Sequence, residues 1–218
     1  MTADPRSRNY YLFPPTDSLR HKLQREFPHA IVQRRMGYLS LRGTQVLRES
    51  WFTIPGLFVG SDPLPIEVGR SLLMRGLRIA VAESCTGGLL CYLLTQVPDA
   101  SHYFWQGFVP YRVEAKISTL GLSPGSIRRQ GSVSRAVAIS LACNAQKLSG
   151  VEIGIGLTGL AGPSGGTPQT PIGTVFVAIG TPIGMSSHRL RLRGSRQSIR
   201  HQAALWALLF LHQALRRF

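Results

Sequence analysis

Apolar residues recur along the chain in two patterns, which predict alternating helices and buried strands from about residue 64 onward. Helical spacing of the apolar positions predicts helices at 66–75, 89–96, 134–148 and 198–217. Short apolar runs predict strands at 77–82, 151–157, 173–179 and 188–192. Ser134 directly precedes the third helical pattern and is the expected N-cap of that helix. This alternation predicts an α/β fold: a three-layer sandwich whose mostly parallel or mixed central sheet is covered by helices on both faces.

The first 61 residues follow a different pattern and are assigned to a separate unit, 1–61, ahead of a main domain at 62–218. Prolines interrupt this segment at positions 14, 15, 28 and 55. A short helix is expected over 19–27, with short extended pieces at 30–32, 38–41 and 51–54. We therefore expect a small α+β segment before the main domain.

The charge balance of the chain is strongly basic. Its 218 residues include 25 Lys and Arg against 10 Asp and Glu, a formal net charge of +15. Seven arginines and no acid lie between Met185 and Phe218. Such a region attracts phosphate-bearing ligands or nucleic acid, yet no nucleic-acid-binding motif with interleaved aromatic residues accompanies it. An arginine-rich composition explains the excess equally well, so a nucleic-acid partner is disfavoured but stays open.

Several classes of protein are excluded or disfavoured by simple counts. A hydrophobic fraction of 44% is too high for a mainly disordered chain. The most apolar run, 203–211, falls short of the roughly 20 residues of a membrane-spanning helix, and the N-terminus lacks the apolar core of a signal peptide. Three cysteines without CxxC spacing and six histidines without HxH or HxxxH spacing disfavour a disulfide framework or a metal site. We expect a cytoplasmic protein without membrane contact or bound metal.

The first candidate for chemistry is the segment 82–88, AESCTGG, which follows a predicted strand and opens a predicted helix. Free backbone N–H groups and the helix dipole favour an anion at such a junction. Gly87 and Gly88 permit close approach of backbone or ligand. Ser84 is suited to three roles, as helix cap, phosphate contact or nucleophile, and spacing alone does not choose among them. The segment is neither a GxSxG elbow nor a Walker loop.

The second candidate is Lys116, one of only three lysines in this arginine-rich chain. An amine loses its proton when it is desolvated or placed near other cations, whereas an arginine does not. Lys116 is therefore suited to act as a general base beside a serine hydroxyl. The alternative is an ordinary solvated lysine on a helix.

The third candidate is the glycine-rich loop 159–166, which leaves the strand predicted at 151–157. Gly159 and Gly162 belong to a run of glycines whose successive N–H groups are able to form a nest for an oxyanion or a phosphate. Thr158 offers a hydroxyl at the strand end, where open α/β sheets bind ligands. Arg196 and Arg200, before and within the last helix, are candidates to hold a phosphate or carboxylate, or else belong to a solvated face.

Taken together, these motifs resemble the CinA carboxy-terminal domain family. The resemblance rests on 82–88, on Tyr111 with 114–116, and on 131–134, 158–163, 165–168 and 171–175. It covers roughly seven tenths of the chain, from about residue 64 to the end. Stand-alone members of this family are the PncC-like nicotinamide mononucleotide (NMN) deamidases.

The resemblance implies an amidohydrolase that converts NMN to nicotinic acid mononucleotide and ammonia in NAD salvage, without a metal or organic cofactor. Ser84 would attack the carboxamide carbon, and Lys116 would take the serine proton with assistance from Tyr111. Thr158 and nearby loop amides would stabilise the oxyanion or orient the amide, while Arg196 would contact the nucleotide phosphate. The resemblance also implies a homodimer. It makes residues 1–61 interpretable as a remnant of the connecting domain of full-length CinA proteins.

Two departures from the family pattern define the alternatives. Arg112 and Val113 replace a Ser-Asn pair, and Ser195 replaces an Asp before Arg196. A buried hydrogen bond that is no longer made costs about 1–3 kcal/mol, so one alternative is a catalytically weakened module that binds a nucleotide or a protein partner. Another is an amidohydrolase with a shifted substrate, if Arg112 faces the site.

Overall fold

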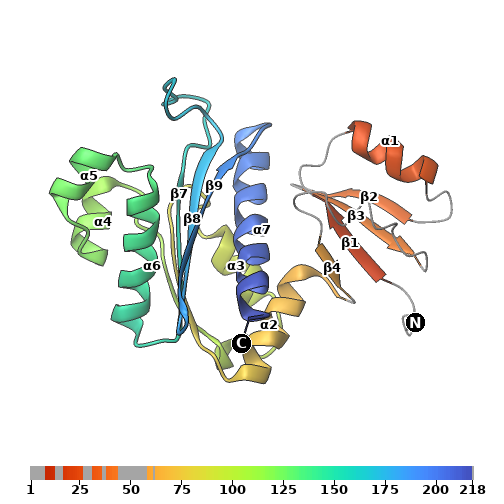
Figure 1. The fold of residues 1–218 in the computed structure, drawn as a ribbon, viewed down its shortest axis with the longest axis horizontal. Helices are drawn as coiled ribbons and strands as arrows, with labels where there is room; N and C mark the ends of the chain where they lie inside the picture. The colour runs from red at the N-terminus through yellow and green to blue at the C-terminus, as the bar shows by residue number, and fades with distance from the viewer. Residues whose placement is uncertain are drawn as a thin grey trace.

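A mixed five-stranded sheet forms the centre of the main domain (Figure 1). The computed structural model describes residues 8–12, 17–26, 31–35, 38–43, 58–60 and 62–217. The strands of the central sheet are β5 (Ile79–Glu83), β6 (Phe104–Phe108), β7 (Ile153–Gly159), β8 (Thr174–Thr181) and β9 (Gly184–Arg191). Their order is β6-β5-β7-β8-β9, in which β5 runs parallel to β6 and β7 while β8 is antiparallel to both of its neighbours.

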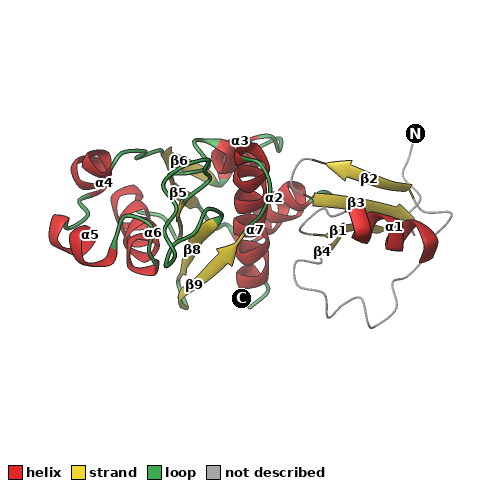
Figure 2. Cartoon of the chain, turned by 90° about the horizontal axis from the view of Figure 1, so that it is seen from above, coloured by secondary structure: helices red, strands yellow, loops and turns green. Residues whose placement is uncertain are grey.

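Helices cover both faces of this sheet, as Figure 2 shows from above. One face carries α2 (Leu64–Arg75), α3 (Leu89–Thr95) and α7 (Arg196–Leu215). The other face carries α4 (Val113–Leu120), α5 (Pro124–Gln130) and α6 (Arg135–Ser149), and a short 3₁₀ helix, η2 (Ala100–His102), precedes β6. The predicted three-layer α/β sandwich with a mixed sheet is confirmed. No helix in the described part of the chain is long and apolar enough to span a bilayer.

The N-terminal segment contains a four-stranded antiparallel sheet with one helix, α1 (Asp17–Glu26). Its strands are β1 (Arg8–Leu12), β2 (Ile31–Arg35), β3 (Tyr38–Gly43) and β4 (Phe58–Gly60), in the order β2-β3-β1-β4. The sequence pattern predicts the helix and the second and third strands, but not β1 or β4. The extended piece expected at 51–54 lies outside the described residues.

Three elements of the main domain, namely β6, α4 and α5, were not predicted, and one strand is longer than expected. All three are short, and β6 and α5 each contain a glycine, which weakens the local signal for a strand or a helix. Strand β9 begins at Gly184 rather than at 188, because its length is set by antiparallel pairing with β8 from Thr181 onward and not by its own apolar residues.

Helix α6 packs unusually close to the sheet. Gly154 and Gly156 of β7 face this helix, and a Cβ at either position would collide with the backbone carbonyl oxygens of Ala142 or Ala138. The helix begins as predicted, with the Ser134 hydroxyl accepting the N–H of Val137 at 3.3 Å. The close approach brings the segment before α6 to the carboxyl end of β7.

Candidate active site

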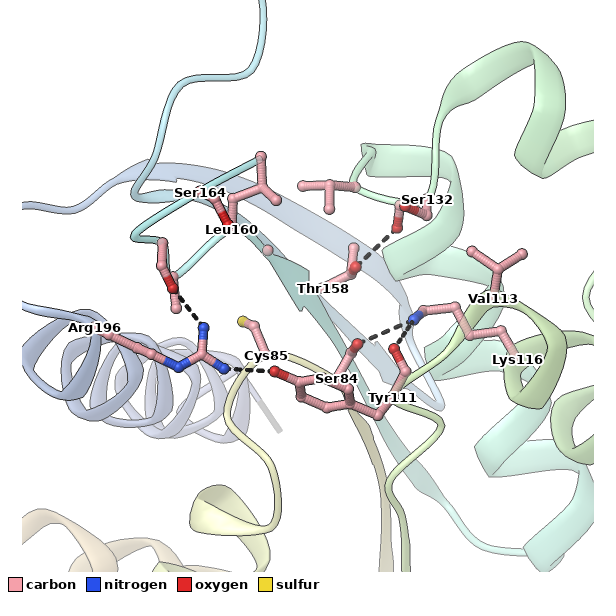
Figure 3. Close-up of a pocket in the computed structure, with 14 residues that line it drawn as sticks. Ser84, Cys85, Tyr111, Val113, Lys116, Ser132, Thr158, Leu160, Ser164 and Arg196 are labelled. Carbon is pink, nitrogen blue, oxygen red and sulfur yellow. Dashed lines mark hydrogen bonds between the residues drawn. The ribbon is translucent and has the colours of Figure 1, made fainter. Parts of the chain in front are cut away.

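A pocket of about 250 Å³ opens where β5 and β7 end (Figure 3). Its lining comes from four separated segments and one helix start: 84–85, residues of 111–116, 132–133, residues of 158–164, and Arg196. The structure therefore brings together all three candidate motifs of the sequence. The pocket lies at the carboxyl ends of adjacent parallel strands, the usual position of ligands in open α/β sheets.

Ser84 and Lys116 meet inside this pocket, although they are 32 residues apart in the chain. The Nζ atom of Lys116 lies 3.0 Å from the Oγ atom of Ser84. Both side chains are buried, with 7% of Ser84 and 3% of Lys116 exposed. Lys116 is thus not the solvated helix lysine that the sequence left as its alternative.

Burial shifts the ionisation of Lys116 toward its neutral amine. Burial lowers the pKa of Lys116 from its ordinary value of 10.5, because desolvation penalises the ammonium form. The carbonyl oxygens of Pro110 and Tyr111 lie 3.0 and 3.4 Å from Nζ. A neutral amine has two N–H groups and one lone pair, so two hydrogens directed at these carbonyls leave the lone pair for the Ser84 hydroxyl. This is the arrangement that a general base requires.

The Ser84 turn, residues 84–88, is held by a residue that the sequence did not single out. Glu83 is fully buried, and its carboxylate accepts the N–H groups of Leu90 and Cys91 at 3.1 and 3.0 Å. The N-cap of helix α3 is Gly88, which has no side chain to accept a hydrogen bond, so Glu83 supplies the missing acceptor. The signal available in the sequence was an acid at the end of an apolar run, shortly before the glycines that precede a predicted helix.

The neighbouring thiols are poor nucleophiles. Burial raises the pKa of Cys85, which lines the pocket beside Ser84, to about 12. Burial also raises the pKa of Cys91. A thiol needs to ionise in order to attack, so Ser84 is the better nucleophile at neutral pH.

Thr158 lies in the pocket with its hydroxyl already engaged. Its Oγ1 donates to the carbonyl oxygen of Ser132 at 2.8 Å, and the side chain is almost fully buried. A hydroxyl has a single hydrogen to donate. With that hydrogen used, the oxygen is available to accept a hydrogen bond from a ligand, which fits the orienting role better than donation to an oxyanion.

Arg196 and Tyr111 form the opposite, exposed side of the pocket. The guanidinium group donates to the Gly162 carbonyl and to the Tyr111 hydroxyl, both at 2.6 Å. The Tyr111 hydroxyl is therefore directed at Arg196, while its backbone carbonyl faces Lys116. The two residues connect the loop 159–166 with the segment before α4.

Comparison with known proteins identifies the family to which this chain belongs. The model of the CinA C-terminal domain matches residues 61–215. The chain belongs to this family. A CinA-like protein from Anaeromyxobacter sp. (strain K) is 45% identical over 157 residues, and one from Synechocystis sp. is 44% identical over 157 residues. These matches cover 72% and 71% of this chain but 38% of each relative, so the chain spans about two fifths of the length of these curated relatives.

Solved CinA superfamily structures share the fold. A protein of this superfamily from Klebsiella pneumoniae 700603 is similar with a TM-score of 0.69 and 32% identity, over 71% of this chain and 97% of that one. The competence/damage-inducible protein CihA from Agrobacterium tumefaciens gives a TM-score of 0.66 and 33% identity, over 71% and 97%. Both likenesses support the α/β architecture of this CinA domain.

Not every predicted residue of the CinA domain reaches the pocket. Gly87, Gly88 and Arg200 are outside its lining. Arg112 is exposed and forms an ion pair with Glu114 at 3.1 Å, away from the lining, whereas Val113 does line the pocket. The sequence analysis gave no individual role to six lining residues: Cys85, Ser132, Val133, Leu160, Ala161 and Ser164. Within the described residues, no cluster of three or more potential metal-binding side chains is found.

Proposed function

We propose that this CinA domain is an amidohydrolase that deamidates NMN to nicotinic acid mononucleotide and ammonia, a product that serves NAD salvage. The observation that carries the proposal is the buried contact of 3.0 Å between Lys116 Nζ and Ser84 Oγ. A serine hydroxyl needs an adjacent base to become a nucleophile, and a desolvated lysine amine is such a base. The family resemblance supplies the substrate.

The reaction proceeds through an acyl-enzyme. The Ser84 oxygen attacks the carboxamide carbon while Lys116 takes the hydroxyl proton. Lys116 then returns this proton to the amide nitrogen, the C–N bond breaks, and ammonia leaves. In the second half, Lys116 takes a proton from water, the hydroxide attacks the ester carbon, and the Ser84 oxygen leaves with the proton of Lys116. Nicotinic acid mononucleotide is released and the amine is neutral again.

The remaining pocket residues bind and orient the substrate in this proposal. The Thr158 oxygen accepts an N–H of the carboxamide, which turns the carbonyl carbon toward Ser84. Loop amides near Gly159 face the developing oxyanion, the position where preorganised donors contribute most. Arg196, at the exposed side, exchanges its contact with Tyr111 or Gly162 for the nucleotide phosphate.

Ammonia release from NMN tests the proposal. We expect wild-type protein to release ammonia, and Ser84→Ala and Lys116→Met to lose at least about 10³-fold in rate. Two matched controls, Ser101→Ala and Lys147→Met, change an exposed serine and an exposed lysine outside the pocket and retain the wild-type rate. Activity that survives in Ser84→Ala contradicts the serine mechanism.

A second function, nucleotide binding without turnover, is favoured by one observation. Val113 lines the pocket at a position where the family pattern carries an amide side chain. This second function predicts that wild-type protein binds NMN, as measured by calorimetry, but releases no ammonia from it. We further propose a cytoplasmic homodimer with residues 1–61 as a connector remnant, and sedimentation velocity tests the dimer.

A further inference from the structure

Two arginines occupy one face of the first two turns of α7, because residues four apart on a helix are neighbours. Arg196 is the first residue of the helix and Arg200 follows one turn later. The first turn contains no acidic residue, and cations at a helix N-terminus oppose the helix dipole. A placement that is unfavourable for the helix alone indicates a purpose elsewhere, which is found in the groups that the arginines bind.

Arg200 binds the Ser84 turn rather than the pocket. Its Nε and Nη2 atoms donate to the carbonyl oxygen of Thr86 at 3.2 and 2.7 Å. Thr86 is two residues beyond Ser84, and its side chain is fully buried. Arg200 therefore fastens the middle of the turn to α7.

Gly87 is shaped to admit this guanidinium group. Its φ of +60° lies in the left-handed region, and a Cβ at this position would stand 3.1 Å from Nη2 of Arg200. Both the backbone conformation and the space therefore favour glycine. The glycine that the sequence marked for a ligand makes room for Arg200.

The rest of the turn is fixed at its two ends. The Glu83 carboxylate joins the strand end to the first N–H groups of α3, and the Ser84 N–H donates to the Leu157 carbonyl at 3.1 Å. Helices α3 and α7 lie on one face of the sheet, whereas Lys116 belongs to α4 on the other face (Figure 2). The distance from Ser84 to Lys116 thus depends on where the Ser84 turn is held relative to α4 on the opposite face of the sheet.

We propose that Arg200 is a positioning residue, which holds the Ser84 turn so that Oγ stays within proton-transfer distance of Lys116. This inference rests on the proposed function, and it gives the two arginines of α7 different tasks. Arg196 faces the pocket and binds the anionic end of the substrate. Arg200 acts through Thr86 on the nucleophile and does not touch the substrate.

Steady-state kinetics with NMN separates the two tasks. Loss of positioning lowers kcat, since a shift of about 1 Å in a reacting group costs on the order of 10²-fold. We expect Arg200→Met to lower kcat about 10- to 100-fold with KM within about two-fold of wild type. Arg200→Lys keeps one hydrogen-bond donor group, so its kcat is expected to lie between those of wild type and Arg200→Met. Arg191→Met, which removes an exposed arginine of β9 outside the pocket, leaves both constants unchanged. A raised KM with an unchanged kcat in Arg200→Met overturns the proposal.

Covalent labelling of Ser84 needs no substrate, so it tests the positioning role of Arg200 independently of which substrate the domain uses. Phenylmethanesulfonyl fluoride, followed by intact-protein mass spectrometry, reports the reactivity of Ser84 with Ser84→Ala as the blank. We expect Arg200→Met, and to a smaller degree Arg200→Lys, to be labelled more slowly than wild type and Arg191→Met at equal folded fraction by circular dichroism. If wild type is labelled but releases no ammonia from NMN, and Arg200→Met is labelled more slowly, the positioning role is supported and NMN is contradicted as the substrate. Equal labelling of all four proteins, or no labelling of wild type, overturns the positioning role.

Discussion

The pocket has two walls of opposite character. The buried wall consists of Ser84, Lys116 and Thr158, of which 7%, 3% and 1% are exposed. The exposed wall consists of Tyr111, with 54% exposed, and Arg196. Desolvation changes proton affinity only where water is excluded, so the buried wall is suited to proton transfer. The exposed wall keeps its charge and its solvent, which suits recognition of an anion.

Replacement of the base by a side chain of the same charge is expected to have the largest effect on the buried wall. Lys116→Arg preserves a cation on the buried wall but removes a group that is able to lose its proton. We expect kcat for ammonia release to fall about 10²- to 10⁴-fold, the usual contribution of general base catalysis. Substantial activity in this variant, measured with enzymatic detection of ammonia, would show that Lys116 contributes charge rather than basicity.

On the exposed wall, removal of Arg196 is expected to weaken binding. Arg196→Met deletes a charge-assisted hydrogen bond worth about 1.5–3 kcal/mol, which corresponds to roughly a 10- to 150-fold rise in KM for NMN. The value of kcat changes little, because no reacting atom is touched. Nicotinamide riboside, which lacks the phosphate, is the matched comparison: its KM is expected to be the same in both proteins.

The pH dependence of the reaction tests the electrostatics of the buried wall. Because burial lowers the pKa of Lys116, the neutral amine forms at a pH below the ordinary lysine value of 10.5. The rate constant kcat/KM is therefore expected to rise about tenfold per pH unit below that pKa and to level off before pH 10.5. A profile that keeps rising beyond 10.5 contradicts a desolvated base.

The smallest expected effect lies between the two walls, at Val113. Val113→Asn restores an amide at a lining position that is apolar in this chain. We expect a gain of a few-fold in kcat/KM, corresponding to about 1 kcal/mol for one hydrogen bond. An isosteric Val113→Thr variant provides the control for shape, and equal kinetics in all three proteins would show that the position does not contact substrate.

The sequence predicted the buried wall better than the scaffold that holds it. Ser84 stood out because it lies where a predicted strand meets a predicted helix, and Lys116 because lysine is rare in this chain. The N-cap at Ser134 followed from local backbone chemistry. The role of Glu83 depends on an acceptor that reaches seven residues forward, and that of Arg200 on a carbonyl 114 residues away. For Glu83 the sequence offers only an acid shortly before a glycine N-cap. For Arg200 local spacing offers nothing, since its contact arises only when α7 packs against the sheet.

Gly154 and Gly156 leave one face of β7 without side chains, so this domain is expected to tolerate substitutions poorly at these two positions. A single added methyl group there would push α6 away from the sheet, and with it Ser132, whose carbonyl receives the Thr158 hydroxyl. The width of the pocket therefore depends partly on the absence of side chains at these two positions of β7. Mutational surveys that seek active-site positions by loss of ammonia release should recover these two glycines beside Ser84, although neither lines the pocket.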